Sequence, residues 1–499
     1  MADRWSMRGP VLWAFVMSWG QRLMALVVTF VLAALLGPER YGIVAIAIVF
    51  VALLQVFLEQ GLNTAVIQRE ELEPEHVDAA FWMNLVWSIV LTLLAMGLAY
   101  PWSRLTDPRV FTVIIALAPT LIFRGLTMVQ QAQMQRSLRF KALAARTNAS
   151  MFTSGVAGLA LAFGGAGIWA LVAQQVVYDF VSVIVLWTAS SWRPRLAFSR
   201  RHGRELLSYS LSVFGANLGG FLNRRADALL IGAFFHPAIV GIYRLADRMV
   251  DVVLEMTSRP IGSVALPRFS RLQNDAEGLR ASVLGAVRLS LTVTAPPLLV
   301  IAACSPWLLG ALGKDWAGGA TALKLLCVVG IVKGLVSFAG PVLFAVGRPR
   351  LRASVSWTLA AISVAATLVA GALFSDEARR HQLLGMSGIR AAIFIGAVAP
   401  LSLWAVQRAV PGLRLAALLP LFRAPLISGG AALATGYGIE RSGVLDDLGA
   451  RTALLIAGPT VAVVAVAMLS LTDRRARREL LRIGGRLSGR RVRHQSSAA

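Results

Sequence analysis

Lysine, histidine, cysteine and acidic residues are all scarce in this chain of 499 residues. It contains four lysines, five histidines, two cysteines and 25 aspartates and glutamates, and charged residues make up only 15% of it. Soluble domains carry about a quarter charged residues, so water is not the main solvent of this chain. Cys304 and Cys327 lie in apolar runs without CxxC spacing, which indicates neither a disulfide framework nor a zinc site.

Catalytic motifs are also missing. No HExxH sequence, Walker loop or nucleophile elbow occurs, and no segment between the apolar runs is long enough to fold as a catalytic domain. We therefore expect a protein that is not an enzyme and binds no metal or organic cofactor, while coupling to H+ or Na+ stays open. The histidines fall in predicted loops or in the C-terminal tail: His76, His202, His236, His381 and His494.

Long apolar runs fill most of the sequence, with 57% hydrophobic residues and a mean hydropathy of +0.68. A bilayer-spanning helix needs roughly 20 apolar residues, and lipid-exposed backbone must satisfy its hydrogen bonds internally. The sequence therefore predicts an all-α integral membrane protein. The first run has no small-residue cleavage site, so we expect it to be retained. Fourteen transmembrane helices are predicted, at about residues 11–36, 42–67, 79–101, 110–134, 142–163, 167–190, 206–234, 238–263, 281–305, 320–346, 353–374, 389–408, 416–438 and 450–472.

The basic residues are distributed unevenly between alternate loops. The chain has 45 arginines and a net charge of +24, and loops on one side of the predicted helices hold most of the basic residues. By the positive-inside rule both termini are predicted to be cytoplasmic. We do not expect nucleic-acid binding, because many of the arginines lie in short gaps between apolar runs. The Arg-rich tail, residues 473–499, is predicted to bind the anionic headgroups of membrane lipids.

Two short matches indicate an internal repeat. The sequence GPERYGIVAIA from Gly37 aligns with HPAIVGIYRLA from His236, and Arg124 aligns with Lys333. Parallel repeats of this kind typically place a binding site between the two halves. We therefore predict two pseudo-symmetric six-helix bundles around a central cavity, plus two C-terminal helices. The predicted parts are an N-terminal lobe (1–205), a C-terminal lobe (206–408), two additional helices (409–472) and the basic tail (473–499).

Many charged residues lie inside the predicted helices. A charge at the centre of a spanning helix costs about 2.5–3.5 kcal/mol, so these side chains should face water or a partner. Arginine binds phosphate oxygens in bidentate fashion, so a cationic lumen would suit a multiply charged anion such as a pyrophosphate. Ion pairs that fix helix packing are the alternative, because an aspartate follows Arg244 and Arg248 by one turn. The candidate substrate-binding residues are Arg22, Arg124, Arg224, Arg225, Arg244, Arg248 and Lys333.

Acidic residues inside the helices are candidates for ion coupling. A carboxylate in a low-dielectric lumen can hold a proton or a sodium ion. Pairing with a lumen arginine is an equally good interpretation of each one. The candidates are Glu59, Asp179, Asp227, Asp247 and Asp251.

Several longer stretches resemble one known family. They include the sequence from Gly37 to Asp78, QRSLRFKALA from Gln135, NRRADALLIG from Asn223 and LPRFSRLQND from Leu266. As an ordered set over about residues 10–350, they resemble the polysaccharide transporter family. This family contains lipopolysaccharide and exopolysaccharide flippases and belongs to the multidrug/oligosaccharidyl-lipid/polysaccharide exporter superfamily.

The resemblance implies a fold and a function. The family's fold is two six-helix bundles around a central cavity. Its function is to move an undecaprenyl-diphosphate-linked oligosaccharide unit across the bacterial inner membrane by alternating access, for exopolysaccharide, capsule or O-antigen synthesis. By this analogy the diphosphate would meet lumen arginines while the polyprenyl tail stays in lipid. A polysaccharide polymerase and chain-length proteins are further expected partners.

One motif departs from the family pattern. The seventh helix of the family usually carries Arg, Asn, any residue and Asp, whereas here Arg225 is followed directly by Ala226 and Asp227. The resemblance therefore carries over either Arg224 or Arg225, together with Asp227.

Other functions stay in view. A multidrug exporter of the same superfamily would be expected to have a more acidic or neutral lumen for cationic drugs, so the arginine excess counts against it. A lipid II flippase is compatible with the same charges. A polytopic glycosyl ligase or polymerase would need a large external loop with catalytic groups, which the sequence lacks. A pore or structural membrane protein would be separated from a carrier by a transport assay.

Overall fold

The computed structural model describes residues 8–59, 66–67, 72–195, 199, 218–219, 221–222, 225, 227–375, 377–445 and 448–472. The regular elements in these residues are all helical, which confirms the predicted all-α class. Ten helices in the described part of the chain are long and apolar enough to cross a membrane. Arg224, the basic tail and most of the predicted span at 206–234 lie outside the described residues.

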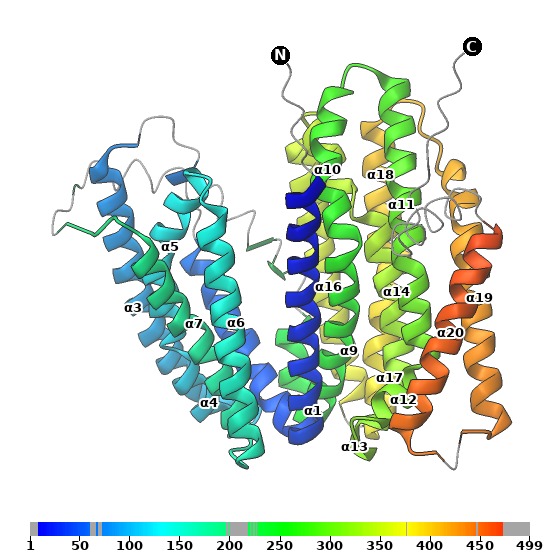
Figure 1. Cartoon of the computed structure of the whole chain (residues 1–499), viewed down its shortest axis with the longest axis horizontal. Coiled ribbons are helices and arrows are strands. Elements are labelled where there is room, and N and C mark those ends of the chain that lie inside the picture. The colour runs from blue at the N-terminus through cyan, green and yellow to red at the C-terminus, as the bar shows by residue number, and fades with distance from the viewer. Residues whose placement is uncertain are drawn as a thin grey trace. The chain divides into compact units, whose positions relative to one another are not determined.

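The chain divides into two compact units. Unit 1 consists of Met1–Met249, Leu312–Gly319 and Ala353–Ile393. Its helices are α1 (Arg8–Leu58), α3 (Pro74–Leu105), α4 (Val110–Leu117), α5 (Thr120–Arg136), α6 (Phe140–Phe163), α7 (Ile168–Ala189), most of α9 (Pro237–Met256), α13 (Lys314–Ala317), most of α16 (Pro349–Phe374) and α17 (Arg379–Ile393). Within it α6 packs along α7, and α5 packs against both α3 and α7 (Figure 1).

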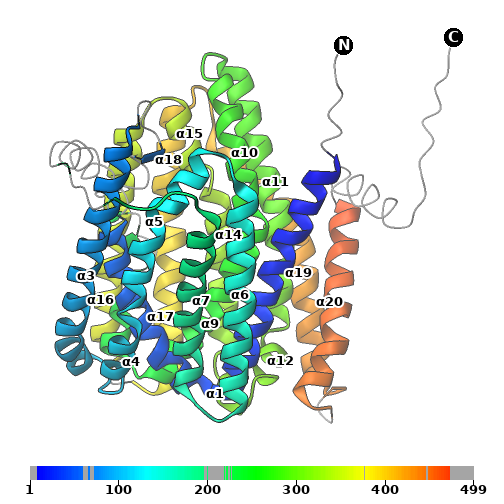
Figure 2. The same ribbon diagram turned by 60° about the vertical axis from the view of Figure 1, so that its left-hand side comes forward.

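Unit 2 consists of Val250–Ala311, Ala320–Arg352 and Phe394–Ala499. Its remaining elements are α10 (Ser258–Arg271), α11 (Ala276–Ala303), α12 (Ser305–Gly310), α14 (Ala320–Val336), α15 (Ala339–Ala345), the π-helix η1 (Phe394–Val398), α18 (Ala399–Ala409), the 3-10 helix η2 (Leu415–Leu418), α19 (Leu419–Ser442) and α20 (Ala450–Thr472). Helix α19 packs between α11 and α20, and Figure 2 shows α19 and α20 side by side.

Small residues allow α19 to approach α11 closely. A Cβ atom built on Gly429 would lie 1.8 Å from a methyl group of Leu299, and one built on Gly436 would lie 2.9 Å from Ala303. Apolar side chains gain little from leaving lipid, so membrane helices associate through such close packing. The division of the chain into lobes at residues 205, 408 and 472 stays a prediction.

The segment labelled α1 contains the break expected between the spans at 11–36 and 42–67. It covers 51 residues and consists of two helices that meet at a kink at Gly37, where φ is 76°. Glycine adopts this left-handed conformation at little cost, and Pro38 follows with a φ that suits the first turn of a helix. The first helix therefore ends at Gly37, inside the short gap expected between the two spans, and the second begins directly after it.

The two copies of the internal repeat contact each other through their glycines. A Cβ atom on Gly42 would lie 1.7 Å from the carbonyl oxygen of Pro237, and a Cβ atom on Gly241 would lie 2.0 Å from the carbonyl oxygen of Pro38. These positions correspond in the aligned sequences, so the contact is reciprocal. Both segments belong to unit 1.

The predicted span at 389–408 begins too late. Helix α17 already starts at Arg379 and continues through η1 into α18. Its first turns are polar on one side, and its buried positions are Gln382, Leu383, Met386, Ser387, Arg390 and Ala391. A search for continuous apolar residues misses this amphipathic segment, because half of its surface is polar.

Candidate functional site

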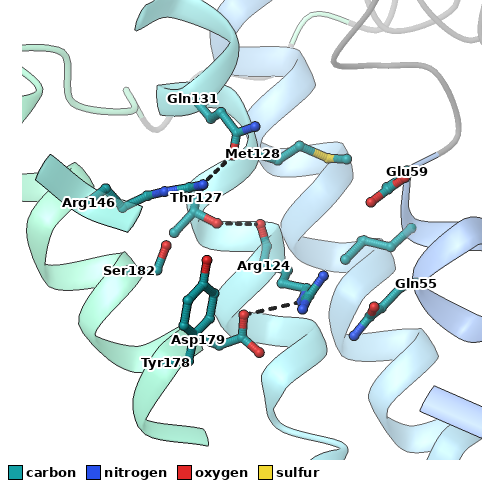
Figure 3. A pocket seen from close by; sticks show the side chains of 11 residues that line it. Gln55, Glu59, Arg124, Thr127, Met128, Gln131, Arg146, Tyr178, Asp179 and Ser182 are labelled. Atoms are coloured by element: carbon teal, nitrogen blue, oxygen red, sulfur yellow. Dashed lines mark hydrogen bonds and ion pairs between the residues drawn. The ribbon is translucent and has the colours of Figure 1, made fainter. Parts of the chain in front are cut away.

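A polar cavity of about 380 Å³ lies among α1, α5, α6 and α7 of unit 1 (Figure 3). Residues three or four apart on a helix share one face, and this spacing brings polar side chains of α5 and α7 to the same space. The lining residues are Gln55, Leu58 and Glu59 from the end of α1, Arg124, Thr127, Met128 and Gln131 from α5, Arg146 from α6, and Tyr178, Asp179 and Ser182 from α7.

An ion pair between α5 and α7 forms part of the wall. The Nε atom of Arg124 lies 3.2 Å from Oδ1 of Asp179, as Figure 3 shows. Asp179 is only 4% exposed, and the side-chain amide of Gln175 donates to its other oxygen across 2.8 Å. Arg124 keeps about a third of its side chain exposed. The aspartate is therefore held in place, while the guanidinium group is in part open to the cavity.

A second arginine reaches the same cavity from α6. Arg146 donates through Nη1 to the side-chain oxygen of Gln131 on α5, across 2.7 Å. Glu59 lines the cavity from the end of α1 and is exposed. The cavity therefore combines two guanidinium groups with two carboxylates and several amide and hydroxyl groups. Such a wall can bind a polar or charged ligand, or a cation at its carboxylates.

An adjoining cavity of about 340 Å³ shares Arg124 and Tyr178 with the first. It is more apolar, with Met24 and Val28 from α1 and Met151 from α6 among its lining residues. Arg248 of α9 lines it as well. Of the predicted substrate-binding residues, Arg124 and Arg248 thus border one common space.

A separate network of charges joins α9 and α17. Arg390 forms an ion pair with Asp227, and its Nη2 atom donates to Oδ1 of Asp247 across 3.2 Å. The Tyr243 hydroxyl donates to Asp227 across 2.8 Å, and Arg244 donates to Asp247 across 3.5 Å. Arg390 is 7% exposed and Asp247 is 3% exposed. Three predicted site residues, Asp227, Arg244 and Asp247, therefore lie in one buried network.

Lys333 and Asp251 form a third group, within unit 2. The Nζ atom of Lys333 lies 3.3 Å from Oδ1 of Asp251 and 5.9 Å from the centre of the Phe394 ring. Both side chains of the ion pair are mostly buried. A positive charge at this depth is favoured by an acidic partner and by the face of an aromatic ring.

The remaining candidates are placed individually. Arg22 is half-buried on α1, two residues before Met24, which lines the adjoining cavity. Arg225 is half-buried in a helical segment, and Arg224 lies outside the described residues.

Comparison with known proteins gives the family. Residues 31–320, more than half of the chain, match the sequence profile described as polysaccharide biosynthesis protein. The chain belongs to this family. The match confirms the resemblance to polysaccharide transporters that the sequence motifs indicated, and together with the ten apolar helices it makes the chain a multi-pass membrane protein.

Relatives of known role align with part of the chain. It is 25% identical over 300 residues to the succinoglycan biosynthesis transport protein ExoT of Rhizobium meliloti, covering 60% of this chain and 61% of that protein. It is 25% identical over 305 residues to the teichuronic acid biosynthesis protein TuaB of Bacillus subtilis, covering 60% of this chain and 62% of that protein. The alignments thus span about three fifths of these relatives.

A solved structure shares the fold. The lipid II flippase MurJ, in an inward closed conformation, superimposes with a TM-score of 0.72 at 14% sequence identity, covering 93% of this chain and 99% of that one. At this level of identity the likeness concerns the fold alone.

The residues matched by the polysaccharide biosynthesis family include some of the paired charged residues and leave one out. Arg124, Asp179, Asp227 and Asp247 lie within the matched residues, whereas Arg390 lies beyond them.

Arg390 was not among the candidates expected from the sequence, because it fell at the start of the apolar run chosen as a span. The available signal was the spacing of Leu383, Met386, Ser387 and Arg390, which is typical of one buried helix face.

Proposed function

We propose that the chain is a flippase for an undecaprenyl-diphosphate-linked oligosaccharide, and not an enzyme. In this proposal it carries the lipid-linked unit across the bacterial inner membrane by alternating access, with both termini in the cytoplasm. Fourteen helices would form two six-helix lobes and a C-terminal pair. Support comes from the family match, from a relative named as a transport protein and from a flippase that shares the fold.

The observation that carries the proposal is the position of Arg124. It lies near the middle of the continuous span Val110–Arg136 formed by α4 and α5, about 18–21 Å from either end at 1.5 Å per residue. Asp179 likewise lies near the middle of α7. Charges at this depth are costly unless they pair with an opposite charge or face a polar cavity, and Arg124 does both. A cavity with arginines at mid-depth is suited to a diphosphate, because guanidinium groups bind phosphate oxygens in pairs.

Ion coupling would use the carboxylates that border this pathway. Glu59 and Asp179 line the cavity with Arg124. Binding of H+ or Na+ at these groups would change the local charge, and so the affinity for an anion beside them. In this proposal the coupling ion binds at the carboxylates of unit 1.

The test is a flipping assay in proteoliposomes. An undecaprenyl-diphosphate-linked oligosaccharide is added with a label on its sugar, and the fraction accessible to a membrane-impermeant sugar-modifying enzyme is followed in time. Wild type is expected to equilibrate the two leaflets faster than empty vesicles. Arg124→Gln should slow this at least tenfold, Arg124→Lys should slow it less, and Arg379→Gln at an exposed position should have no effect. No flipping by wild type under any ion gradient would reject the proposal.

A lipid II flippase is the second candidate, favoured by the shared fold with MurJ. Both substrates carry a diphosphate on a polyprenyl chain, so cavity charge alone does not separate them. The same vesicles are therefore loaded with lipid II in a parallel arm. Faster movement of lipid II than of other oligosaccharide lipids would favour this candidate.

A further inference from the structure

The turn between α5 and α6 presents apolar and basic side chains outward. All six residues from Arg136 to Lys141 (RSLRFK) are exposed. Leu138 is 71% exposed and Phe140 is 59% exposed. The segment contains three basic residues and no acidic residue. Within the described part of the chain, no acidic side chain forms an ion pair with Arg139 or Lys141.

The backbone of this turn holds Leu138 in an unfavourable conformation. Its φ is 55°, and it is the one non-glycine residue with a positive φ among those described. The N–H of Arg139 donates to the Met134 carbonyl across 2.8 Å, and the N–H of Leu138 donates to that of Gln135. Helices that end in this way usually have glycine at the left-handed position. A leucine there keeps its side chain on the outside of the turn, at a cost that glycine would avoid.

The span that ends at this turn places it at the bilayer surface. Val110–Arg136 is one of the helices apolar enough to cross a membrane, and its 27 residues are about 40 Å long at 1.5 Å per residue. This is more than the hydrocarbon core of about 30 Å and close to a whole bilayer of about 40–45 Å. The end of the span at Arg136, and the turn that follows it, must therefore lie in the headgroup layer.

Aromatic residues mark the same level. Helix α7 ends, and α3 begins, at the end of the helices where α5 meets α6 (Figures 1 and 2). Trp187 and Trp192 pack on Phe81 there, with ring centres 6.0 Å and 5.7 Å away, and Arg193 lies over the Trp187 ring. Tryptophan gathers at membrane interfaces, so lipid phosphates are within reach of this end.

We propose that the turn from Ser137 to Lys141 binds the anionic headgroups of the surrounding bilayer. Leu138 and Phe140 insert at the boundary between headgroups and acyl chains, and Arg139 and Lys141 bind lipid phosphates. The partner is bilayer phospholipid because the turn is basic, apolar and at headgroup depth, which together fit an anionic interface. Since α5 carries Arg124 and α6 carries Arg146, the bound turn would fix the depth of both arginines. This proposal does not depend on the flippase proposal.

The experiment measures the depth of the turn in nanodiscs. An environment-sensitive fluorophore is attached to Ser137→Cys, with Cys304 and Cys327 replaced by alanine. The discs contain phosphatidylcholine, alone or mixed with phosphatidylglycerol, and a lipid with a spin label near the headgroup is titrated in. Quenching by the spin-labelled lipid is expected, and it should increase with the fraction of phosphatidylglycerol.

Charge variants test the headgroup contact. Each basic residue near an anionic membrane surface strengthens the binding of a segment to that surface by about 1 kcal/mol, or about fivefold. The double variant Arg139→Gln with Lys141→Gln should therefore weaken the response of the turn to phosphatidylglycerol by about 30-fold. The matched control is Arg379→Gln with Arg380→Gln, which removes the same charge from exposed positions at the start of α17 and should leave the response unchanged.

Leu138→Gly separates insertion from folding. It should reduce quenching in both kinds of disc, while the Tm in detergent stays equal to wild type or rises, because glycine suits φ of 55°. Equal access of aqueous iodide to the label in detergent and in all discs would overturn the proposal. So would a response to phosphatidylglycerol that survives loss of Arg139 and Lys141, or that is lost in the control.

Discussion

Arg390 on α17 donates to Asp247 on α9 across 3.2 Å, inside unit 1. The same aspartate accepts from Arg244, and the same arginine pairs with Asp227. Two positive and two negative side chains therefore share one buried network. Part of the positive charge that the sequence assigns to a lumen is therefore balanced by an acid, since Arg244 pairs with Asp247 of its own helix. Arg124 is also paired, with Asp179 of α7, but about a third of its side chain stays exposed and it borders a cavity.

The Arg390 network makes a strong prediction for stability. Removing one member of a buried ion pair leaves an uncompensated charge and costs about 3–5 kcal/mol, so Arg390→Ala should lower the Tm in detergent markedly. Arg379→Gln, on the exposed start of the same helix, should change stability by less than about 0.5 kcal/mol. Thermal unfolding followed by tryptophan fluorescence checks both. An Arg390→Ala variant as stable as wild type would show that the network does not hold α9 and α17 together.

A double-mutant cycle on Arg124 and Asp179 separates structure from function. Because the two side chains are in contact, their substitutions should couple by about 0.5–3 kcal/mol. We expect Asp179→Asn to lower the Tm, and Arg124→Gln with Asp179→Asn to recover part of the loss. Flipping should remain slow in the double variant, because the cavity has lost its central guanidinium group. Full recovery of flipping together with stability would assign the pair to packing alone.

The reciprocal glycine contact predicts that one added methyl group is damaging. A Cβ atom on Gly42 would lie 1.7 Å from the backbone oxygen of Pro237, so Gly42→Ala must move one helix, at a cost of about 1–3 kcal/mol. Gly97→Ala on α3 is the control, since no atom lies within 4 Å of its Cβ position. There the alanine should stabilise the helix by about 0.5–1 kcal/mol. Relative to wild type, the Tm should therefore fall for Gly42→Ala and rise for Gly97→Ala. A Gly42→Ala variant with the Tm of wild type would contradict the contact.

The loop between α3 and α4 predicts a pH dependence. Hydrogen bonds from Arg109 hold the pKa of Asp107 below its ordinary value. The unfolded chain therefore binds more protons than the folded one as the pH falls below about 4. The contribution of this pair is present above that pH and is lost as the pH drops through the lowered pKa of the folded state. Asp107→Asn should remove this part of the acid sensitivity, which Tm measurements across the acidic range would show as a shallower decline.

The sequence was sufficient for the class of fold. Apolar runs predict spanning helices because length and hydropathy are local properties, and α6, α11 and α20 lie close to their expected positions. The break at Gly37 falls in the gap expected after residue 36. The early start of α17 was not predicted, because an amphipathic segment averages out in a hydropathy search.

Individual residues of the candidate site could be predicted from the sequence, but the contacts between residues of different helices could not. Residue type and depth single out Arg124 and Asp179, but their pairing joins α5 to α7, and no spacing within one helix encodes it. Arg390 shows the same limit, since its two acidic partners are both more than a hundred positions away in the chain. Spacing did find the contact between Arg244 and Asp247, because both lie on one turn of α9.

The obstacles facing Gly42 and Gly241 are main-chain carbonyl groups, which every amino acid has. Where two side chains clash in a core, a smaller residue at the neighbouring position can make room. A larger residue at Gly42 or Gly241 cannot be accommodated in this way, because the carbonyl group stays whatever the neighbouring residue is. Only a shift of a whole helix could make room. Each copy of the repeat thus fixes the residue allowed in the other, and suppressor screens starting from Gly42→Ala should return reversion to glycine far more often than second-site changes at Pro237.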